Sequence, residues 1–290
     1  MKYGVIDIGS NSVRLMMSED TNTLYKVLET TQLSEGLALT GELTQAAMQR
    51  TVDAIERFYK KALNEGAVKI YPFATEAVRS ANNKDVFIKM LNNRGIDIDV
   101  VPSQNEAILG FSGAYTDGQK AVMDIGGAST EIAVGNQDGL IYAKSVPIGI
   151  VRIKDKCLED KEKINNYINE MLSQYGEVPD FEDILAIGGT PSSFVSIYLK
   201  MKVYDTKKVD FYQLTQEMIR ECLDKIENLS FEDRLRVDGL SPKRRDVIVG
   251  AGYLLLAIMK KFNKSYVIVR ESDNLEGYLK YKLGLISKLR

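Results

Sequence analysis

The sequence contains no histidine and only two cysteines, Cys157 and Cys222, in 290 residues. Every catalytic arrangement that pairs histidine with serine or cysteine is therefore excluded. The two cysteines do not form a Cys-x-x-Cys pair, so the sequence also lacks a zinc-binding pattern. Any bound metal must be held by oxygen ligands, which favours magnesium, manganese or calcium.

The net charge is small, and the sequence has no long apolar run. The net charge is −2, so no overall field attracts nucleic acid or an anionic membrane, and an anionic ligand must be held by local groups. The longest apolar run, residues 247–259, is too short to cross a bilayer and is flanked by basic residues, which predicts a buried helix. No signal-peptide pattern precedes the first expected strand, residues 3–6, and cysteine is rare. We therefore expect a cytoplasmic protein without membrane or specific nucleic-acid partners.

One ten-residue segment occurs twice. Residues 6–15 recur as residues 123–132, with Asp, Ile, Gly and Ser at matching positions. In each copy an apolar run precedes the aspartate, a turn of small residues follows, and a second apolar run comes next, which predicts a strand-turn-strand hairpin. A duplicated hairpin indicates a duplicated lobe. The chain, with 44% hydrophobic residues, is long enough for two such cores.

The segments after each hairpin alternate between strand and helix patterns, which is typical of α/β proteins. In the first lobe we expect strands at residues 23–29, 69–74 and 97–101, and helices at 44–64, near 75 or 82, and from 103. In the second lobe we expect strands at 120–124, 130–134, 140–146, 183–187 and 266–269, and helices at 160–174, 191–199 and 276–283. The polar stretch 116–119 is the expected boundary.

The two hairpin turns are candidate phosphate sites. Glycine lets a backbone approach a ligand closely, and successive N–H groups and hydroxyls of such a turn can point at phosphate oxygens. The candidates are Gly9, Ser10, Asn11 and Ser12 in the first turn and Gly126, Gly127 and Ser129 in the second. Asp7 and Asp124 precede the turns and are placed to hold a hydrated divalent cation. One copy alone would favour an ordinary hairpin turn, but its repetition favours the phosphate role.

Two further segments suggest anion binding, each with a structural alternative. Gly188, Gly189 and Thr190 follow a strand, and we expect Thr190 to be a helix N-cap, which places a helix N-terminus at the cleft. A purely structural strand-to-helix turn is at least as well supported. The Lys-Arg-Arg segment 243–245 crowds the start of a helix, where the macrodipole disfavours cations. A bound anion and a surface turn paired with Asp246 explain it equally well.

Three charged residues have structural interpretations on spacing alone. Glu106 lies three residues after Ser103, which is the spacing of a capping box. Glu131 lies on a hairpin strand and is expected to face solvent. Arg79 is expected to be a solvated arginine on a helix.

Taken together and in order, these segments resemble the exopolyphosphatase / guanosine pentaphosphate phosphatase (Ppx/GppA) family, within the actin, Hsp70 and sugar-kinase superfamily. The resemblance spans the whole chain and rests on residues 6–12, 33–37, 74–79, 105–107, 124–131, 147–149, 188–190 and 244–248. It implies an α/β fold of two actin-like (ribonuclease H-like) lobes, residues 1–117 and 118–290, with a central cleft. It also implies that a C-terminal helix, at about 278–290, packs back on the N-terminal lobe.

The resemblance further implies roles for the candidate residues. Glu106 matches the catalytic carboxylate that orients and deprotonates the attacking water, which replaces its capping interpretation, and Glu131 matches a second site carboxylate. The turns at 9–12 and 126–130, the latter including Thr130, match phosphate-binding segments. Arg79 belongs to the phosphate site and Asp124 lies near the metal. A carboxylate base and a water nucleophile suffice for phosphoryl transfer without histidine.

Three positions depart from the family pattern. Ala128 replaces a third glycine, Asn105 replaces an acidic residue, and Leu275 replaces an arginine. The missing arginine is expected to alter the grip on phosphate and the preferred substrate length. The sequence also lacks the additional C-terminal helical domains of the family's long members, so it is expected to be a short form with the catalytic core.

The expected activity is metal-dependent removal of the terminal phosphate of polyphosphate or of pppGpp, with Mg²⁺, or Mn²⁺, as cofactor. Two alternatives remain open. Ala128 and Leu275 suggest a non-hydrolytic sensor of (p)ppGpp or polyphosphate, and the shared fold also allows an actin-superfamily ATPase or kinase. The oligomeric state is open, with a homodimer among the options.

Overall fold

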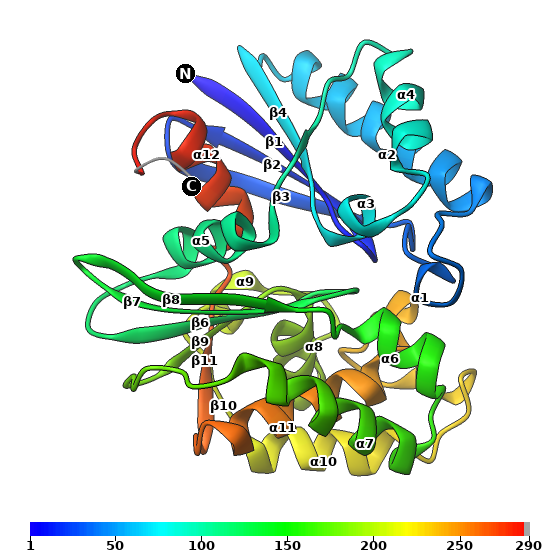
Figure 1. The fold of residues 1–290 in the computed structure, drawn as a ribbon, viewed down its shortest axis with the longest axis vertical. Helices are drawn as coiled ribbons and strands as arrows, with labels where there is room; N and C mark the ends of the chain where they lie inside the picture. The colour runs from blue at the N-terminus through cyan, green and yellow to red at the C-terminus, as the bar shows by residue number, and fades with distance from the viewer. Residues whose placement is uncertain (287–290) are drawn as a thin grey trace. The chain divides into compact units, whose positions relative to one another are not determined.

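The computed structural model describes residues 1–286 and divides the chain into two compact units. Unit 1 contains residues 1–113 together with the C-terminal segment from Asn274, and unit 2 contains residues 114–273. The chain therefore passes from one unit to the other twice (Figure 1). Residues 287–290, which the expected C-terminal helix included, lie outside the described residues.

Unit 1 is built on a mixed sheet with the strand order β3-β2-β1-β4-β5. The strands are β1 (Lys2–Ile8), β2 (Ser12–Glu19), β3 (Asn22–Thr30), β4 (Lys69–Ala74) and β5 (Asp99–Val100). The first three are antiparallel to one another, whereas β4 and β5 run parallel to β1. The predicted hairpin is formed, and Asp7 lies opposite Arg14 in its register.

Helices cover both faces of the unit 1 sheet (Figure 1). They are α1 (Leu37–Thr40), α2 (Gln45–Asn64), α3 (Glu76–Ser80), α4 (Lys84–Asn92), α5 (Ser103–Ala114) and α12 (Asn274–Lys282). One face packs Ile6 and Ile8 against α2, and the other packs Val5 and Phe73 against α5 and α12. Because side chains alternate along a strand, Asp7 lies on the same face as Val5. The helix expected near residue 75 or 82 is in fact two short helices, α3 and α4, separated at Ala81, whose backbone is extended.

Unit 2 repeats this plan with the strand order β10-β11-β9-β6-β7-β8. The strands are β6 (Lys120–Ile125), β7 (Thr130–Asn136), β8 (Gly139–Val146), β9 (Ile184–Ile187), β10 (Gln213–Thr215) and β11 (Tyr266–Val269). Strands β6, β7 and β8 are antiparallel, as β1, β2 and β3 are, and β9 and β11 continue the sheet parallel to β6. The duplication predicted from the repeated segment is therefore present in both sheets.

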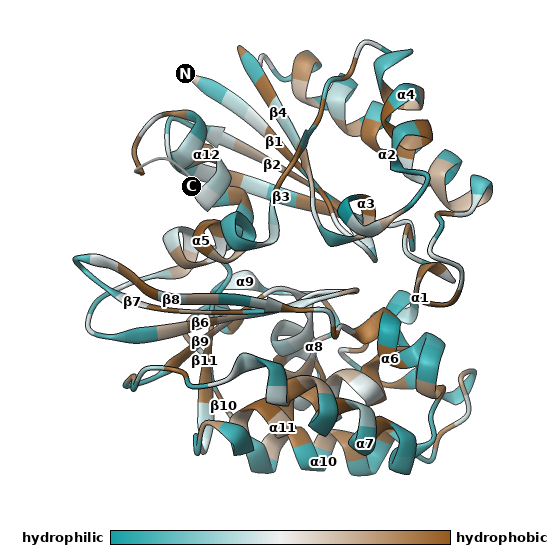
Figure 2. Ribbon diagram, viewed as in Figure 1, coloured by the Kyte–Doolittle hydropathy of each residue, from teal (hydrophilic) through white to brown (hydrophobic). Residues whose placement is uncertain are grey.

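The helices of unit 2 pack on the sheet face that carries Met123 and Ile125. They are α6 (Ile150–Cys157), α7 (Lys161–Leu172), α8 (Gly189–Tyr198), α9 (Thr206–Val209), α10 (Gln216–Ile226) and α11 (Ile248–Lys261), with 3₁₀ turns at Ser173–Tyr175, Asp233–Arg236 and Pro242–Arg244. The apolar run predicted to be a buried helix is α11, which Figure 2 shows as hydrophobic along most of its length. Among residues 1–286, no helix is both long enough and apolar enough to cross a membrane.

The start of α8 differs from the prediction. Its N-cap is Gly188, with φ 83° and ψ −177°, and the helix begins at Gly189 rather than Pro191. That backbone conformation is open only to glycine, so Gly188 ends the strand and starts the helix by itself. The predicted N-cap at Thr190 is wrong, because Thr190 lies inside the first turn and its hydroxyl accepts a hydrogen bond from Arg244.

Candidate functional site

The turn between β6 and β7 is held from one side by the start of α6. Three of its carbonyls accept hydrogen bonds there: Gly126 from the N–H of Ile150 (3.0 Å), Gly127 from the N–H of Val151 (2.8 Å), and Ala128 from Nε of Arg152 (2.7 Å). In a trans peptide the N–H of the following residue points opposite to the carbonyl. The N–H groups of Gly127, Ala128 and Ser129 therefore point away from α6. Successive N–H groups directed to one side form an anion-binding nest.

The turn between β1 and β2 is held in the same way, by the segment that follows β3. The carbonyl of Ser10 accepts from the N–H and the hydroxyl of Ser34 (3.0 and 3.2 Å), and that of Asn11 accepts from the N–H groups of Thr31 and Gln32 (3.0 and 2.9 Å). By the same peptide geometry, the N–H groups of Asn11 and Ser12 point away from this segment. The motif at residues 33–37 thus has a physical role that the sequence did not reveal, because it backs the first turn.

The glycines that open the two turns occupy equivalent positions. Gly9 donates its N–H to the carbonyl of Ser12 at 3.0 Å, and Gly126 donates to that of Ser129 at 3.0 Å. A Cβ atom at Gly9 would lie 3.0 Å from the Ser12 carbonyl oxygen, and one at Gly126 would lie 3.1 Å from that of Ser129. The close approach that requires glycine here is therefore made by the turn's own backbone.

The second turn also explains the Pro-Ile-Gly motif at residues 147–149. A Cβ atom at Gly149 would lie 2.5 Å from the carbonyl of Gly127, so the backbones of the two segments are in direct contact. Ala128, which departs from the family pattern, is not among the described residues with positive φ, so its methyl group causes no backbone strain. The hydroxyl of Thr130 donates to the carbonyl of Ile148 at 2.5 Å, and its side chain is fully buried. The hydroxyl proton of Thr130 is therefore used in a hydrogen bond that stabilises the turn.

Two carboxylates lie side by side next to the second turn. Asp124 on β6 is directly opposite Glu131 on β7, and Glu131 is opposite Ser145 on β8. Directly opposite residues have Cβ atoms about 4.5–5.5 Å apart, and like charges at such positions repel. Glu131 is only 3% exposed and accepts a hydrogen bond from the Ser145 hydroxyl at 2.5 Å, so the expectation that it faces solvent is wrong. Gly188 leaves room for Asp124, because a Cβ atom there would lie 2.8 Å from the Asp124 Oδ1.

The equivalent pair in unit 1 has opposite charges. Asp7 is opposite Arg14, and its Oδ2 accepts from Nε (3.0 Å) and Nη2 (2.5 Å) of that arginine. Arg14 occupies the position in the first repeat that Glu131 occupies in the second. Asp7 was predicted to hold a cation with Asp124, but Arg14 already supplies positive charge to Asp7. The duplicated hairpins are therefore not electrostatically equivalent.

Arg79 and Glu106 form the centre of a charged cluster in unit 1. Arg79 on α3 donates to Glu106 on α5 at 3.2 Å, to Glu76 at 2.5 Å and to the carbonyl of Val101 at 2.5 Å. Burial acts to lower the pKa of Arg79, but the charges of Glu106 and Glu76 outweigh it and raise the pKa above its ordinary value. The interpretation of Arg79 as a solvated helix arginine is wrong, because its guanidinium pairs with Glu76 on its own helix and contacts Val101, which precedes α5, and Glu106 in the first turn of α5.

Arg244 lies at the first turn of α8. Its Nη2 donates to the Thr190 hydroxyl at 3.3 Å, its guanidinium occupies the space where a side chain at Gly189 would lie, and its Nε has no partner among the described residues. Burial lowers the pKa of Arg244 to about 10, which still leaves it charged at pH 7. Asp246 forms an ion pair with Lys154 at 2.6 Å, and its charge also acts to raise the pKa of Arg244, so a turn balanced by Asp246 and a bound anion both stay as interpretations of this segment. A cation beside a helix N-terminus, with an unused donor, is suited to an anion.

Sequence reasoning missed Arg234, which holds the segment that bears Arg244. Arg234 is 1% exposed, forms two hydrogen bonds with Glu159 (2.5 and 2.8 Å), and donates to the carbonyl of Arg245 at 2.9 Å. It lies in a polar, non-periodic stretch of the sequence, which gave no sign of burial. Leu275, where an arginine was expected, packs in the apolar core of unit 1.

The candidate residues thus fall into one group in each unit. The unit 1 group contains the first turn, Asp7, Arg79 and Glu106. The unit 2 group contains the second turn, Asp124, Glu131, the start of α8 and Arg244. Among residues 1–286, no cluster of three or more acidic or cysteine side chains is arranged to hold a metal.

Comparison with known proteins identifies the family of the chain. Residues 12–284 match the Ppx/GppA phosphatase family. The chain belongs to this family. It is 33% identical to the bifunctional 3-dehydroquinate synthase/phosphatase of Fusobacterium nucleatum over 94% of this chain and 45% of that protein. It is 27% identical to the guanosine-5'-triphosphate,3'-diphosphate pyrophosphatase of Photobacterium profundum, over 99% of this chain and 60% of that protein.

The chain also shares its fold with a solved structure. The crystal structure of an exopolyphosphatase from Cytophaga hutchinsonii is 25% identical, with a TM-score of 0.88, and the match covers 99% of both chains. The predicted α/β fold of actin-like type is confirmed. This Ppx/GppA chain spans about half the length of the two curated relatives described above.

Proposed function

We propose that this chain is a divalent-metal-dependent phosphohydrolase that removes the terminal phosphate of inorganic polyphosphate or of pppGpp. The observation that supports this most strongly is the pair of equivalent turns, each with successive N–H groups directed away from the segment that backs it. Family membership gives the substrate class, since relatives carry the names guanosine-5'-triphosphate,3'-diphosphate pyrophosphatase and exopolyphosphatase. Each turn is proposed to bind phosphate groups of the substrate.

In the proposed reaction Glu106 is the general base. It takes a proton from a water molecule, whose oxygen forms a bond to the terminal phosphorus. The bond from that phosphorus to the bridging oxygen breaks, and the electron pair stays on the shortened phosphate chain. Arg79 holds Glu106 in place and remains charged, so it is suited to contact the phosphate oxygens as negative charge moves onto them. The N–H groups of Gly127, Ala128 and Ser129 are proposed to bind phosphate oxygens in the second turn.

The metal is proposed to be Mg²⁺, with Mn²⁺ as the alternative, held by Asp124 with Glu131 beside it. Two neighbouring carboxylates on adjacent strands, one facing a glycine, fit a cation that keeps several waters and binds few protein ligands. When bound, such an ion neutralises charge on the phosphate oxygens. Asp7 is a weaker candidate, since Arg14 already balances its charge.

The test is release of phosphate from polyphosphate and from pppGpp, measured side by side with Mg²⁺, with Mn²⁺ and with EDTA. We expect release with either metal and none with EDTA. Turnover that persists in EDTA would contradict the metal requirement. Faster hydrolysis of ATP than of both substrates would favour the ATPase alternative, and saturable binding without turnover under every metal condition would favour the sensor alternative.

A further inference from the structure

The loop that follows α8 carries a dense group of exposed lysines. They are Lys200, Lys202, Lys207 and Lys208, here called the lysine segment. None of the four ammonium groups forms an ion pair within the part of the chain that the structure describes. The single carboxylate among them, Asp205, accepts the N–H of Lys207 at 3.0 Å and caps α9. The segment therefore presents four cations with little local compensation.

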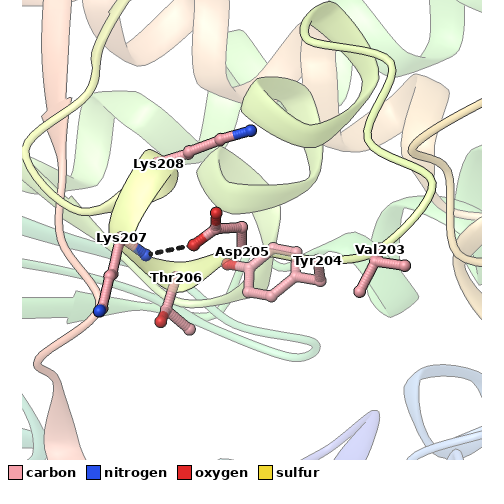
Figure 3. A pocket seen from close by; sticks show the side chains of 6 residues that line it. All are labelled: Val203, Tyr204, Asp205, Thr206, Lys207 and Lys208. Atoms are coloured by element: carbon pink, nitrogen blue, oxygen red, sulfur yellow. Dashed lines mark hydrogen bonds between the residues drawn. The ribbon is translucent and has the colours of Figure 1, made fainter.

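An open pocket lies on this segment. Figure 3 shows its lining from Val203 to Lys208, with the side chains of Lys207 and Lys208 extending in different directions. Val203 and Tyr204 are 83% and 48% exposed, so the pocket is accessible from solvent. Divergent, flexible ammonium groups do not form a rigid fork for one small anion. They suit an anion that is long and has no fixed register.

A short chain of contacts joins the lysine segment to the start of α8. The hydroxyl of Tyr204 donates to Glu271 at 2.6 Å, and Glu271 also accepts from the hydroxyl of Ser192, in the first turns of α8, at 3.0 Å. Lys202 and Lys207 lie two and three residues from Tyr204, a reach of about 7–11 Å even for extended chain. Tyr204, Glu271 and Ser192 therefore connect the lysine segment to the first turns of α8.

We propose that the lysine segment binds the distal part of a long polyphosphate chain while phosphates nearer its end occupy the second turn and the start of α8. This inference rests on the proposed function. The chain as a whole has a net charge of −2, so the attraction is local and acts only on a ligand long enough to extend from the second turn to the loop. A short substrate such as tripolyphosphate would not extend that far. The lysine segment would thus set the preference for chain length.

The test replaces all four lysines with glutamine and compares KM and kcat for long-chain polyphosphate and for tripolyphosphate. We expect KM for the long chain to rise about tenfold or more and to depend less steeply on salt, because fewer counterions are released on binding. The value of kcat and the KM for tripolyphosphate should not change. The control replaces Lys69, Lys84, Lys89 and Lys260, which are also exposed, form no ion pair within residues 1–286, and change net charge equally.

Equal changes in KM for the two substrates, or an equal effect in the control variant, would overturn the inference. Binding of fluorescent long-chain polyphosphate to wild type and variant separates this inference from the proposed function. If wild type hydrolyses nothing, weaker binding by the lysine variant alone still supports the inference, and unchanged binding overturns it. Equal binding of single-stranded RNA that displaces polyphosphate would also overturn it, since it would show a general polyanion surface.

Discussion

Replacement of Glu106 by glutamine is expected to lower kcat for phosphate release by about 10²–10⁴-fold, which is the usual contribution of a general base. Glutamine keeps the shape of the side chain and can still accept a hydrogen bond from Arg79, but it cannot take a proton from water. The KM for polyphosphate should change little, because the turns and not Glu106 are proposed to bind the phosphates. The measurement is steady-state phosphate release at saturating substrate and Mg²⁺.

Glu76→Gln provides the matched control for this prediction. Glu76 accepts a hydrogen bond from Arg79 at 2.5 Å, and Glu106 accepts one from the same guanidinium. Each substitution therefore removes one carboxylate charge beside Arg79. We expect the Glu76 variant to lose much less activity, since Glu76 has no proposed proton-transfer role. Similar losses in the two variants would show that the charge balance of Arg79, rather than a base at Glu106, is what matters.

Replacement of Gly188 by alanine is expected to weaken metal binding and stability together. The residue has φ 83° and ψ −177°, a conformation that costs a non-glycine residue about 1–3 kcal/mol. Its new Cβ would also lie 2.8 Å from Oδ1 of Asp124 and would displace that carboxylate. We expect the Mg²⁺ concentration for half-maximal activity to rise by about 10–100-fold, as when a residue that positions a metal ligand is lost.

The Gly176→Ala variant separates the effect on stability from the effect on metal binding. Gly176 has a similar backbone conformation, φ 66° and ψ −146°, but a Cβ there would meet no atom within 4 Å. Both variants should therefore lose comparable stability in urea, whereas only Gly188→Ala should need more Mg²⁺. An unchanged Mg²⁺ requirement in Gly188→Ala would argue against metal binding at Asp124.

Much of the fold could be predicted from the sequence because its signals are local. The repeated Asp-Ile-Gly-x-x-Ser segment predicted both hairpins, and the helix expected at residues 44–64 is α2, capped by Thr44 through the N–H of Ala47 at 3.2 Å. The short elements α9 and β10 were missed, since four and three residues are too few for a periodic pattern.

The candidate site was predictable in its turns but not in its charges. Spacing within one strand or helix says nothing about a partner on another element, so Arg79 and Glu131 appeared to be solvated residues. Their burial comes from contacts with Glu106, Val101 and Ser145, which are 14–27 residues away in sequence. The proposed roles of these residues come from the family resemblance and not from local pattern.

The sequence did contain one signal that was not used. Within the repeat, Arg14 and Glu131 occupy the same position, so the contrast between an Asp–Arg pair and an Asp–Glu pair could be read directly from the alignment of the two copies. We interpret this contrast as a difference in function between the two hairpins. The unit 2 hairpin has two neighbouring carboxylates, Asp124 and Glu131, which are proposed to hold a cation, whereas Asp7 in the unit 1 hairpin pairs with Arg14.

The most direct test of the account is an amide NMR titration of the Glu106→Gln variant with tripolyphosphate in the presence of Mg²⁺. Charge-assisted hydrogen bonds to phosphate oxygens shift amide protons downfield. The account predicts such shifts at Asn11 and Ser12 in one turn and at Gly127, Ala128 and Ser129 in the other. Binding that leaves the amides of both turns unshifted would contradict it.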